Sequence, residues 1–404
     1  MASPRPTPLP AAFALTVLNS MATGVVTTGV FTITRQGFQW TDLHNNGLGV
    51  LQGIAYIAGA LTIGPLLSRL LARHPWLSAR GVVLAILLGL AALCTLPSLW
   101  HSPGALWLMI GLYDPLNGAL WPLVESYVSG GRSGKELRRV TGLYCITWSS
   151  VLVIAFLAIT GFCERQPREA ILMLGGLHLL SIGFLRWFTP RPLAHGEVDH
   201  EPHPASYGQL LVVFRWLLPL SYLLQSALSP FLPRACALLA VPGTWQMAAN
   251  VGWLLPRAVM FVVMARVATW HGRWAHPAQG CVALLVGFVL TVLAPVVGGA
   301  AGLTLLFTGL AVFGAGMASI YAGAIYYAME VGSAAVDAGG TFEALIGIGF
   351  AGGPLFGLAA AWAVERGLLA SGQYELAVLV PACLVTLLVV AMAFLAARRR
   401  HAPA

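Results

Sequence analysis

The feature that most constrains this chain is a succession of long apolar segments separated by short polar ones. There are about twelve, at approximately 11–34, 46–71, 81–100, 104–129, 139–161, 169–189, 208–235, 245–270, 277–297, 300–328, 338–364 and 375–396. Each can cross a hydrocarbon core of roughly 30 Å as a helix. Only 9% of the residues are charged, whereas soluble domains carry about 25%. The sequence therefore predicts an all-α membrane protein that crosses the bilayer many times.

Basic residues predict the orientation of these helices, because loops rich in Lys and Arg stay on the cytoplasmic side. With the N-terminus inside, fifteen of the 22 Lys and Arg residues fall in cytoplasmic segments and five fall outside. We therefore expect twelve transmembrane helices with both termini cytoplasmic, in the inner (plasma) membrane. Very little polar sequence separates 277–297 from 300–328, which leaves a count of eleven open. The first segment is too long for the apolar core of a secretory signal and is expected to remain as a helix.

One break in composition, the polar and proline-rich stretch 190–207, divides the segments into two sets of six. It predicts an N-terminal six-helix bundle at 1–189, a cytoplasmic linker at 190–207 and a C-terminal six-helix bundle at 208–404. A weak similarity between the halves, at an offset of 200 residues, aligns Thr141 with Thr341. Duplicated transporters have this organisation and bind substrate near the midplane between their repeats. We expect a monomer.

Composition excludes several other classes of protein and site. The net charge of +8 is spread over short loops, so no nucleic-acid partner is predicted. The six cysteines form no CxxC pair, and the histidines of the linker lack the spacing of a metal site. No cofactor or metal is expected. The chain has no GxSxG, HExxH or GxxxxGK[ST] motif, which argues against an enzyme and against direct use of ATP.

Three stripes of polar residues interrupt the apolar segments at positions i, i+4, i+7 and i+11. Because eleven residues make almost three helical turns, the members of a stripe share one helix face. Polar groups within a membrane survive mainly where they face a protein interior or a water-filled cavity. The stripes therefore predict a polar pathway, and they consist of Asp114, Gly118, Trp121 and Glu125; Gln246, Asn250, Trp253 and Arg257; and Ser319, Gly323, Tyr326 and Glu330.

The segment 104–129 contains the predicted proton-coupling residues, Glu125 and Asp114. Pro115 and Pro122 lie in the same segment and should free backbone carbonyl groups near the two acids. Glu125 is the preferred coupling residue, because a partly buried carboxylate can exchange a proton with its surroundings. A structural ion pair with an arginine, or a hydrated position at the interface, is the alternative for Glu125.

Arg257 is predicted to lie near the middle of the eighth helix, where an arginine stays charged and needs a partner. One candidate partner is a carboxylate from Asp114, Glu125 or Glu343. The other is an anionic substrate bound by the guanidinium. Further substrate-cavity residues are predicted from the stripes and their surroundings, with the aromatic rings as stacking or cation–π surfaces: Asn117, Trp121, Gln246, Asn250, Trp253 and Tyr326.

The stretch 64–73 resembles the GxLaDRxGRK motif of the major facilitator superfamily, because it keeps Gly64, Leu66, Arg69 and Arg73. Ser68 replaces the aspartate that helps to lock the cytoplasmic gate in that family. The resemblance implies twelve helices and alternating access, and it places the beginning of the eleventh helix beside the end of the second. Glu343 could then pair with Arg69 as a gate.

The sequence thus predicts a secondary transporter of a small molecule, with protons as the coupling ion and membrane lipid as its environment. Glu125 and Asp114 favour proton-coupled export of an amphipathic or cationic compound. Arg257 leaves proton-coupled uptake of a small carboxylate or sugar open. A non-transporting scaffold or sensor and an intramembrane lipid enzyme are the alternatives from other classes.

Overall fold

The computed structural model describes residues 6–74, 77–132, 134–193, 204–331 and 340–399. Within these ranges the chain forms helices and turns and no strand, which confirms the all-α prediction. We call the part before residue 194 the N-half and the part from residue 204 the C-half. Most of the predicted linker, 194–203, lies outside the described residues.

The helices of the N-half follow the predicted apolar segments. They are α1 (Leu9–Gly24), which continues through the π-helical turn η1 (Val25–Gly29) into α2 (Val30–Phe38), α3 (Asp42–Arg73), α4 (Ala79–Leu93), α5 (Leu96–Leu99), α6 (Pro103–Ser129), α7 (Gly134–Ile159), α8 (Phe162–Arg165), α9 (Pro167–Ile182) and η2 (Gly183–Trp187). Ser78 and Ser102 accept backbone hydrogen bonds at the beginnings of α4 and α6, which satisfies amide groups that a helix leaves unpaired.

The helices of the C-half do the same, with one interruption. They are α10 (Ala205–Leu238), α11 (Gly243–Gln246), η3 (Ala248–Asn250), α12 (Val251–Arg266), α13 (Ala275–Val297), α14 (Gly299–Glu330), α16 (Gly340–Glu365), η4 (Ser371–Gln373) and α17 (Tyr374–Arg399). The predicted eighth segment, 245–270, is therefore not one α-helix, because the 3₁₀ turn η3 separates α11 from α12. A 3₁₀ helix has about 3.0 residues per turn, compared with about 3.6 in an α-helix. Residues spaced i, i+4, i+7 and i+11 therefore do not share one helix face where the chain passes through η3.

Eleven helical units of the described residues are long and apolar enough to cross a membrane. The predicted segment 104–129, which forms α6, is not among them. α6 has 27 residues, enough to span the hydrocarbon core. Its hydropathy is reduced by the same residues that make it a candidate site, above all Asp114, Asn117 and Glu125.

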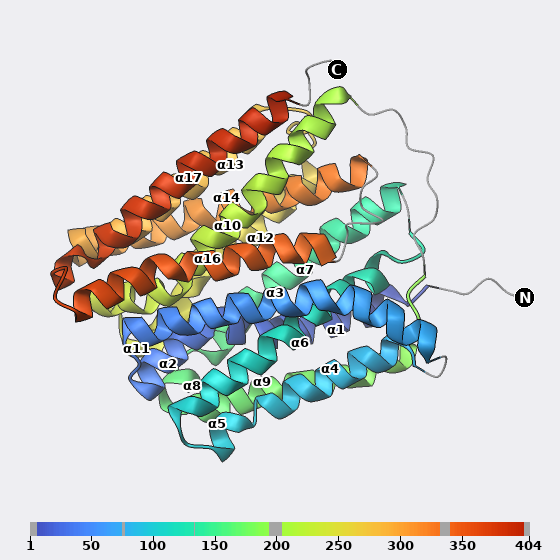
Figure 1. The fold of residues 1–404 in the computed structure, drawn as a ribbon, viewed down its shortest axis with the longest axis horizontal. Helices are drawn as coiled ribbons and strands as arrows, with labels where there is room; N and C mark the ends of the chain where they lie inside the picture. The colour runs from blue at the N-terminus through green and yellow to red at the C-terminus, as the bar shows by residue number, and fades with distance from the viewer. Residues whose placement is uncertain (1–5, 75–76, 133, 194–203, 332–339, 400–404) are drawn as a thin grey trace, which may run out of the picture.

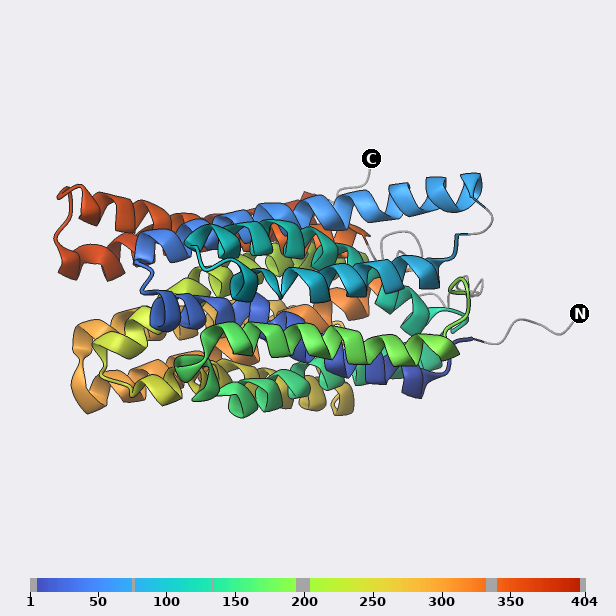
Figure 2. The same cartoon turned by 90° about the horizontal axis from the view of Figure 1, so that it is seen from below.

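Figure 1 shows the helices of the N-half in the lower part of the bundle and those of the C-half in the upper part. The α2–α3 and α16–α17 connections lie at one end of the long axis in both views (Figures 1 and 2). We call this the Asp42 end, after the first residue of α3. The opposite end, where α3 finishes and α7 begins, is called the Arg138 end.

Glycines allow α3 of the N-half to pack closely along α16 of the C-half. A Cβ atom on Gly53 would lie 2.2 Å from the backbone nitrogen of Ala351, and one on Gly347 would lie 2.5 Å from the side chain of Ile57. Small residues are the usual means by which membrane helices bring their backbones together. The α3–α16 interface is thus filled by backbone contact.

Candidate substrate-binding cavity

A cavity of about 130 Å³ lies between the two halves. Its wall is built from α1, η1, α3, α6 and α7 of the N-half and from α10, α12, α14 and α16 of the C-half. Six of the predicted site residues line it: Asn117, Trp121, Glu125, Trp253, Arg257 and Glu343. The volume has room for several water molecules, and the wall mixes carboxylates, a guanidinium and aromatic rings.

The acidic part of the wall consists of Glu125 on α6 and Glu343 on α16. The Tyr56 hydroxyl donates a hydrogen bond to Oε2 of Glu343, and Tyr144 lies within hydrogen-bonding reach of Glu125. The two carboxyl groups are close enough to interact electrostatically. Carboxylates that share a cavity repel each other, and binding one proton relieves that repulsion. The cavity thus brings together one acidic side chain from each half of the chain.

Arg257 forms the basic part of the wall. Its guanidinium lies over the rings of Trp148 and Trp253, with its central carbon 4.6 Å and 4.5 Å from the ring centroids. Its Nε donates to the Ser149 hydroxyl over 3.2 Å, while Nη2 is buried without a hydrogen-bond partner. Among the described residues, no carboxylate forms an ion pair with Arg257. The predicted pairing with Asp114, Glu125 or Glu343 is absent from this structure.

This arrangement leaves Arg257 able to bind an anion. Aromatic faces stabilise a guanidinium by cation–π attraction, but they do not satisfy its N–H groups. A buried donor without a partner costs free energy, and a carboxylate in the cavity would remove that cost by accepting from Nη2. A ligand carboxylate that enters the cavity beside Arg257 could thus supply the acceptor that Nη2 lacks.

Asp114 lies outside the cavity, although it shares α6 with Glu125. Its side chain is fully buried, and neither carboxylate oxygen has a partner in good hydrogen-bond geometry. Gln52 of α3 and Asn117 are the polar side chains that face it. Asn117 Oδ1 also accepts from Trp121 Nε1 at 2.9 Å. A chain of polar side chains thus connects Asp114 to the cavity wall through Asn117.

Three other predicted cavity residues lie elsewhere. Gln246 accepts a hydrogen bond from Gln36 over 3.0 Å, toward the Asp42 end. Asn250 lines a separate cavity of about 10 Å³ and donates to the Met247 carbonyl. Tyr326 packs in a cluster of aromatic rings toward the Arg138 end, stacked on His271 with centroids 4.1 Å apart. None of the four residues of the third stripe, which lies on α14, lines the cavity.

The predicted gate pair, Arg69 and Glu343, is not formed in this structure. Arg69 is exposed, whereas Glu343 is buried and accepts from Tyr56. No ion pair joins the two residues within the described ranges. In this structure Glu343 belongs to the cavity wall, and its pairing with Arg69 as a gate stays a prediction.

Several cavity residues were not predicted from the sequence. They are chiefly Tyr56, Tyr144, Trp148, Tyr222 and Gln225. Two pairs carried a signal, because Tyr144 and Trp148 are four residues apart and Tyr222 and Gln225 are three apart, each pair on one helix face. A search for shorter polar and aromatic stripes would have found them. Tyr56 stands alone in apolar surroundings and gave no periodic signal.

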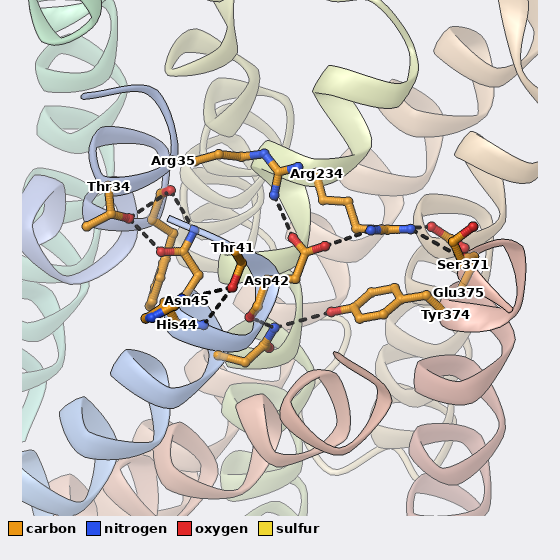
Figure 3. A network of polar contacts seen from close by, with 12 residues as sticks. Thr34, Arg35, Thr41, Asp42, His44, Asn45, Arg234, Ser371, Tyr374 and Glu375 are labelled. Carbon is orange, nitrogen blue, oxygen red and sulfur yellow. Dashed lines mark hydrogen bonds and ion pairs between the residues drawn. The ribbon is translucent and has the colours of Figure 1, made fainter. Parts of the chain in front are cut away.

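Polar contacts join the halves at the Asp42 end, as Figure 3 shows. Arg234 of α10 forms ion pairs with Asp42 of α3 over 2.6 Å and with Glu375 of α17 over 3.0 Å. Arg35 holds the other oxygen of Asp42 at 2.5 Å. Asn46 of α3 also donates to the Tyr374 hydroxyl of α17 over 3.2 Å. Two arginines thus share one carboxylate across the interface between the halves.

The Arg138 end has a simpler connection. Arg138 of α7 and Glu330 of α14 form an ion pair of 2.5 Å, and the Arg138 side chain is 40% exposed. His271, in the connection after α12, lies near this pair. Partial burial lowers the pKa of His271, a shift that Glu330 opposes and Arg138 reinforces. The imidazole ring is therefore mostly neutral at physiological pH.

Solved structures of transporters share the fold of this chain over most of its length. The nucleoside transporter NupG has a TM-score of 0.68 at 15% identity, with 96% of this chain and 98% of that chain covered. The human organic anion transporter MFSD10 has a TM-score of 0.57 at 17% identity, covering 95% and 98%.

A bacterial homologue of the human lysosomal transporter Spinster, in an inward-facing and occupied conformation, has a TM-score of 0.64 at 15% identity and covers 97% and 96%. At the level of sequence, no family model and no curated protein matches the chain. The chain thus has the fold of major facilitator superfamily transporters, as the motif at 64–73 predicted.

Proposed function

We propose that the protein is a proton-coupled secondary transporter that binds a small organic anion at Arg257. The observation that carries this proposal is the buried Nη2 of Arg257, which has no partner and lies in the wall of a cavity between the two halves. An anion bound there would contact the C-half through Arg257. It would contact the N-half through the aromatic side chains of α6 and α7.

Protons would act at Glu125 and Glu343. One carboxylate belongs to each half, so the pair comes together only when the halves close around the cavity. Closing the cavity would favour proton uptake by the pair, and opening it would favour release. Asp114 would serve as a second proton acceptor, connected to the cavity through Asn117.

The membrane arrangement that fits this function has twelve helices, with α6 as the twelfth span and both termini in the cytoplasm. The distribution of basic residues then assigns the Arg138 end to the cytoplasm and the Asp42 end to the outside. The protein would work as a monomer in the inner membrane. Uptake of the anion together with a proton is the direction we propose, since the inward proton gradient would then drive accumulation.

A second candidate is export of a cationic or amphipathic compound in exchange for protons. The paired carboxylates and the aromatic wall favour it, because a cation could replace the proton at Glu125 or Glu343 and stack on Trp121. Arg257 opposes it, since a positive charge in the same cavity repels a cation.

A thermal-shift screen of the purified protein distinguishes the two candidates, because a ligand stabilises the folded state that binds it. We expect small carboxylates to stabilise the wild type and to lose that effect in Arg257→Gln. Arg73→Gln, which removes an exposed arginine outside the cavity, is the control. Stabilisation by organic cations that is lost in Glu125→Gln and kept in Arg257→Gln would replace uptake by export.

A further inference from the structure

A second and larger cavity lies at the α7–α12 interface, away from the candidate substrate site. Its volume is about 650 Å³, and its wall comes from α7 of the N-half, from α12 and α14 of the C-half, and from the connection that follows α12. We call it the lateral groove. Leu143 and Val267, two of its lining residues, are exposed on the surface of the bundle. The groove thus opens sideways, where a membrane protein meets lipid.

Three arginines line the end of this groove nearest to the Arg138 end. Arg138 is neutralised by Glu330. Arg139 and Arg266 are exposed, and neither side chain forms an ion pair or a hydrogen bond with another described residue. Two unneutralised guanidinium groups, one on each half of the chain, therefore stand at the mouth of an apolar groove.

The deeper part of the groove is apolar and open. Its wall includes Ile146, Val262, Ala322 and Ile325. Gly142 belongs to the same wall, and a Cβ atom built on it would meet nothing within 4 Å. The groove therefore has unfilled space beside α7, a helix long and apolar enough to cross a membrane.

We propose that the lateral groove binds an anionic phospholipid. Its phosphate would lie between Arg139 and Arg266, and one acyl chain would enter the space beside Gly142. The charge at the mouth matches a phosphodiester, and clusters of basic residues at the cytoplasmic surface attract anionic lipids. The apolar depth selects a lipid over a free anion.

A lipid in this position would contact both halves of the chain. The inner wall of the groove includes Phe261, whose ring packs edge-on against Trp148 at 5.8 Å and Tyr321 at 5.7 Å. Trp148 and Tyr321 also line the central cavity. The lipid would thus be separated from the substrate site by this group of three rings.

Native mass spectrometry of the full-length protein tests the proposal, with phosphatidylglycerol and phosphatidylcholine of matched chain length as probes. We expect wild type to retain phosphatidylglycerol more strongly than phosphatidylcholine. Arg139→Gln combined with Arg266→Gln should weaken phosphatidylglycerol binding about 30-fold, if each arginine contributes its usual attraction to an anionic lipid. Arg73→Gln combined with Arg399→Gln removes the same charge from the same end of the bundle and should leave binding unchanged.

The acyl chain is tested separately by Gly142→Phe, which fills the groove and keeps both arginines. This variant should lose both lipids, with an unchanged melting temperature because its side chain enters open space. Equal retention of the two lipids by wild type, or unchanged phosphatidylglycerol binding in both groove variants, would overturn the proposal. These results do not depend on transport, so the lipid site and the proposed function fail independently.

Discussion

The two lateral interfaces between the halves are built in opposite ways. Along the α3–α16 interface, glycines bring backbones together until no space remains for a Cβ atom, as at Gly53. Along the α7–α12 interface, the helices meet at Trp148 and Phe261, whereas Gly142 faces open space and the lateral groove opens between the helices. One interface is therefore suited to act as a pivot, and the other to change its width.

The ion pairs that join the halves also differ between the two ends of the bundle. At the Asp42 end, Arg234 and Arg35 share the Asp42 carboxylate, and Arg234 also holds Glu375. At the Arg138 end, the side chains of the Arg138–Glu330 ion pair are 40% and 18% exposed. A buried network loses more when one partner is removed than an exposed pair does. Among the described residues, the ion pairs between the halves are thus more deeply buried at the Asp42 end.

The largest expected effect comes from Arg234→Ala, which leaves Asp42 and Glu375 without their shared cation. Removing one partner of a largely buried network costs about 3 kcal/mol, so the Asp42 end should open. Spin labels on Gln39 and Gln373, one on each half, would report a longer distance. Arg366→Ala removes an exposed arginine from the same end and should leave the distance unchanged. An unchanged distance in Arg234→Ala would show that other contacts close this end.

Gly53→Ala should have the next largest effect. The new methyl group would collide with the backbone of Ala351, and overpacking of this kind costs about 1–3 kcal/mol. The matched substitution Gly142→Ala enters open space and should be neutral or slightly stabilising, because alanine favours a helix over glycine. Thermal unfolding of the two variants in the same detergent measures the difference. Equal melting temperatures would remove the contrast between the interfaces.

Separating Arg138 from Glu330 should have a smaller effect. The pair is partly exposed, so Arg138→Gln or Glu330→Gln should cost less than about 1 kcal/mol. Spin labels on Lys135 and Arg273 would follow the width of the Arg138 end. Exchanging the two charges, with Arg138→Glu and Glu330→Arg together, should restore the wild-type distance. A shift as large as that of Arg234→Ala would contradict the difference between the two ends.

The smallest effect concerns pH at the Arg138 end. Burial lowers the pKa of His271 below its ordinary value, so the folded state disfavours the charged ring. The contribution of His271 to the free energy of unfolding is therefore fully present above the ordinary pKa of histidine, about 6.5. It declines as the pH falls below that value. Wild type should lose slightly more melting temperature between pH 7.5 and 5.5 than His271→Gln does. Identical pH profiles would show that His271 does not contribute.

Much of the fold could be predicted from the sequence, because the length and composition of an apolar segment largely decide whether it spans a membrane. The helix positions and the fold of the superfamily followed from such segments and from the motif at 64–73. Individual helix shapes did not follow. The 3₁₀ turn η3 moves Gln246 off the helix face that carries Arg257. The spacing of polar residues in the sequence is the same with or without such a turn, so the sequence pattern could not reveal it.

The candidate site was predicted only in part, because the sequence pattern does not show which helices pack against one another. Glu125 and Arg257 were found because a charge within an apolar segment needs an explanation. Their surroundings depend on contacts between the halves, which no local pattern encodes. Glu343 was placed at a gate with Arg69, yet the structure puts it beside Tyr56 in the cavity. Trp148 and Ser149 contact Arg257 from the other half.

The most direct test of the account is substrate-dependent proton movement in proteoliposomes that contain a pH-sensitive dye. A carboxylate that stabilises the protein in the thermal-shift screen is added outside, and the internal pH is followed. We predict internal acidification in wild type, loss of that signal in Glu125→Gln and Glu343→Gln with ligand binding kept, and loss of both in Arg257→Gln. Acidification that persists in both glutamate variants would contradict proton coupling at this pair.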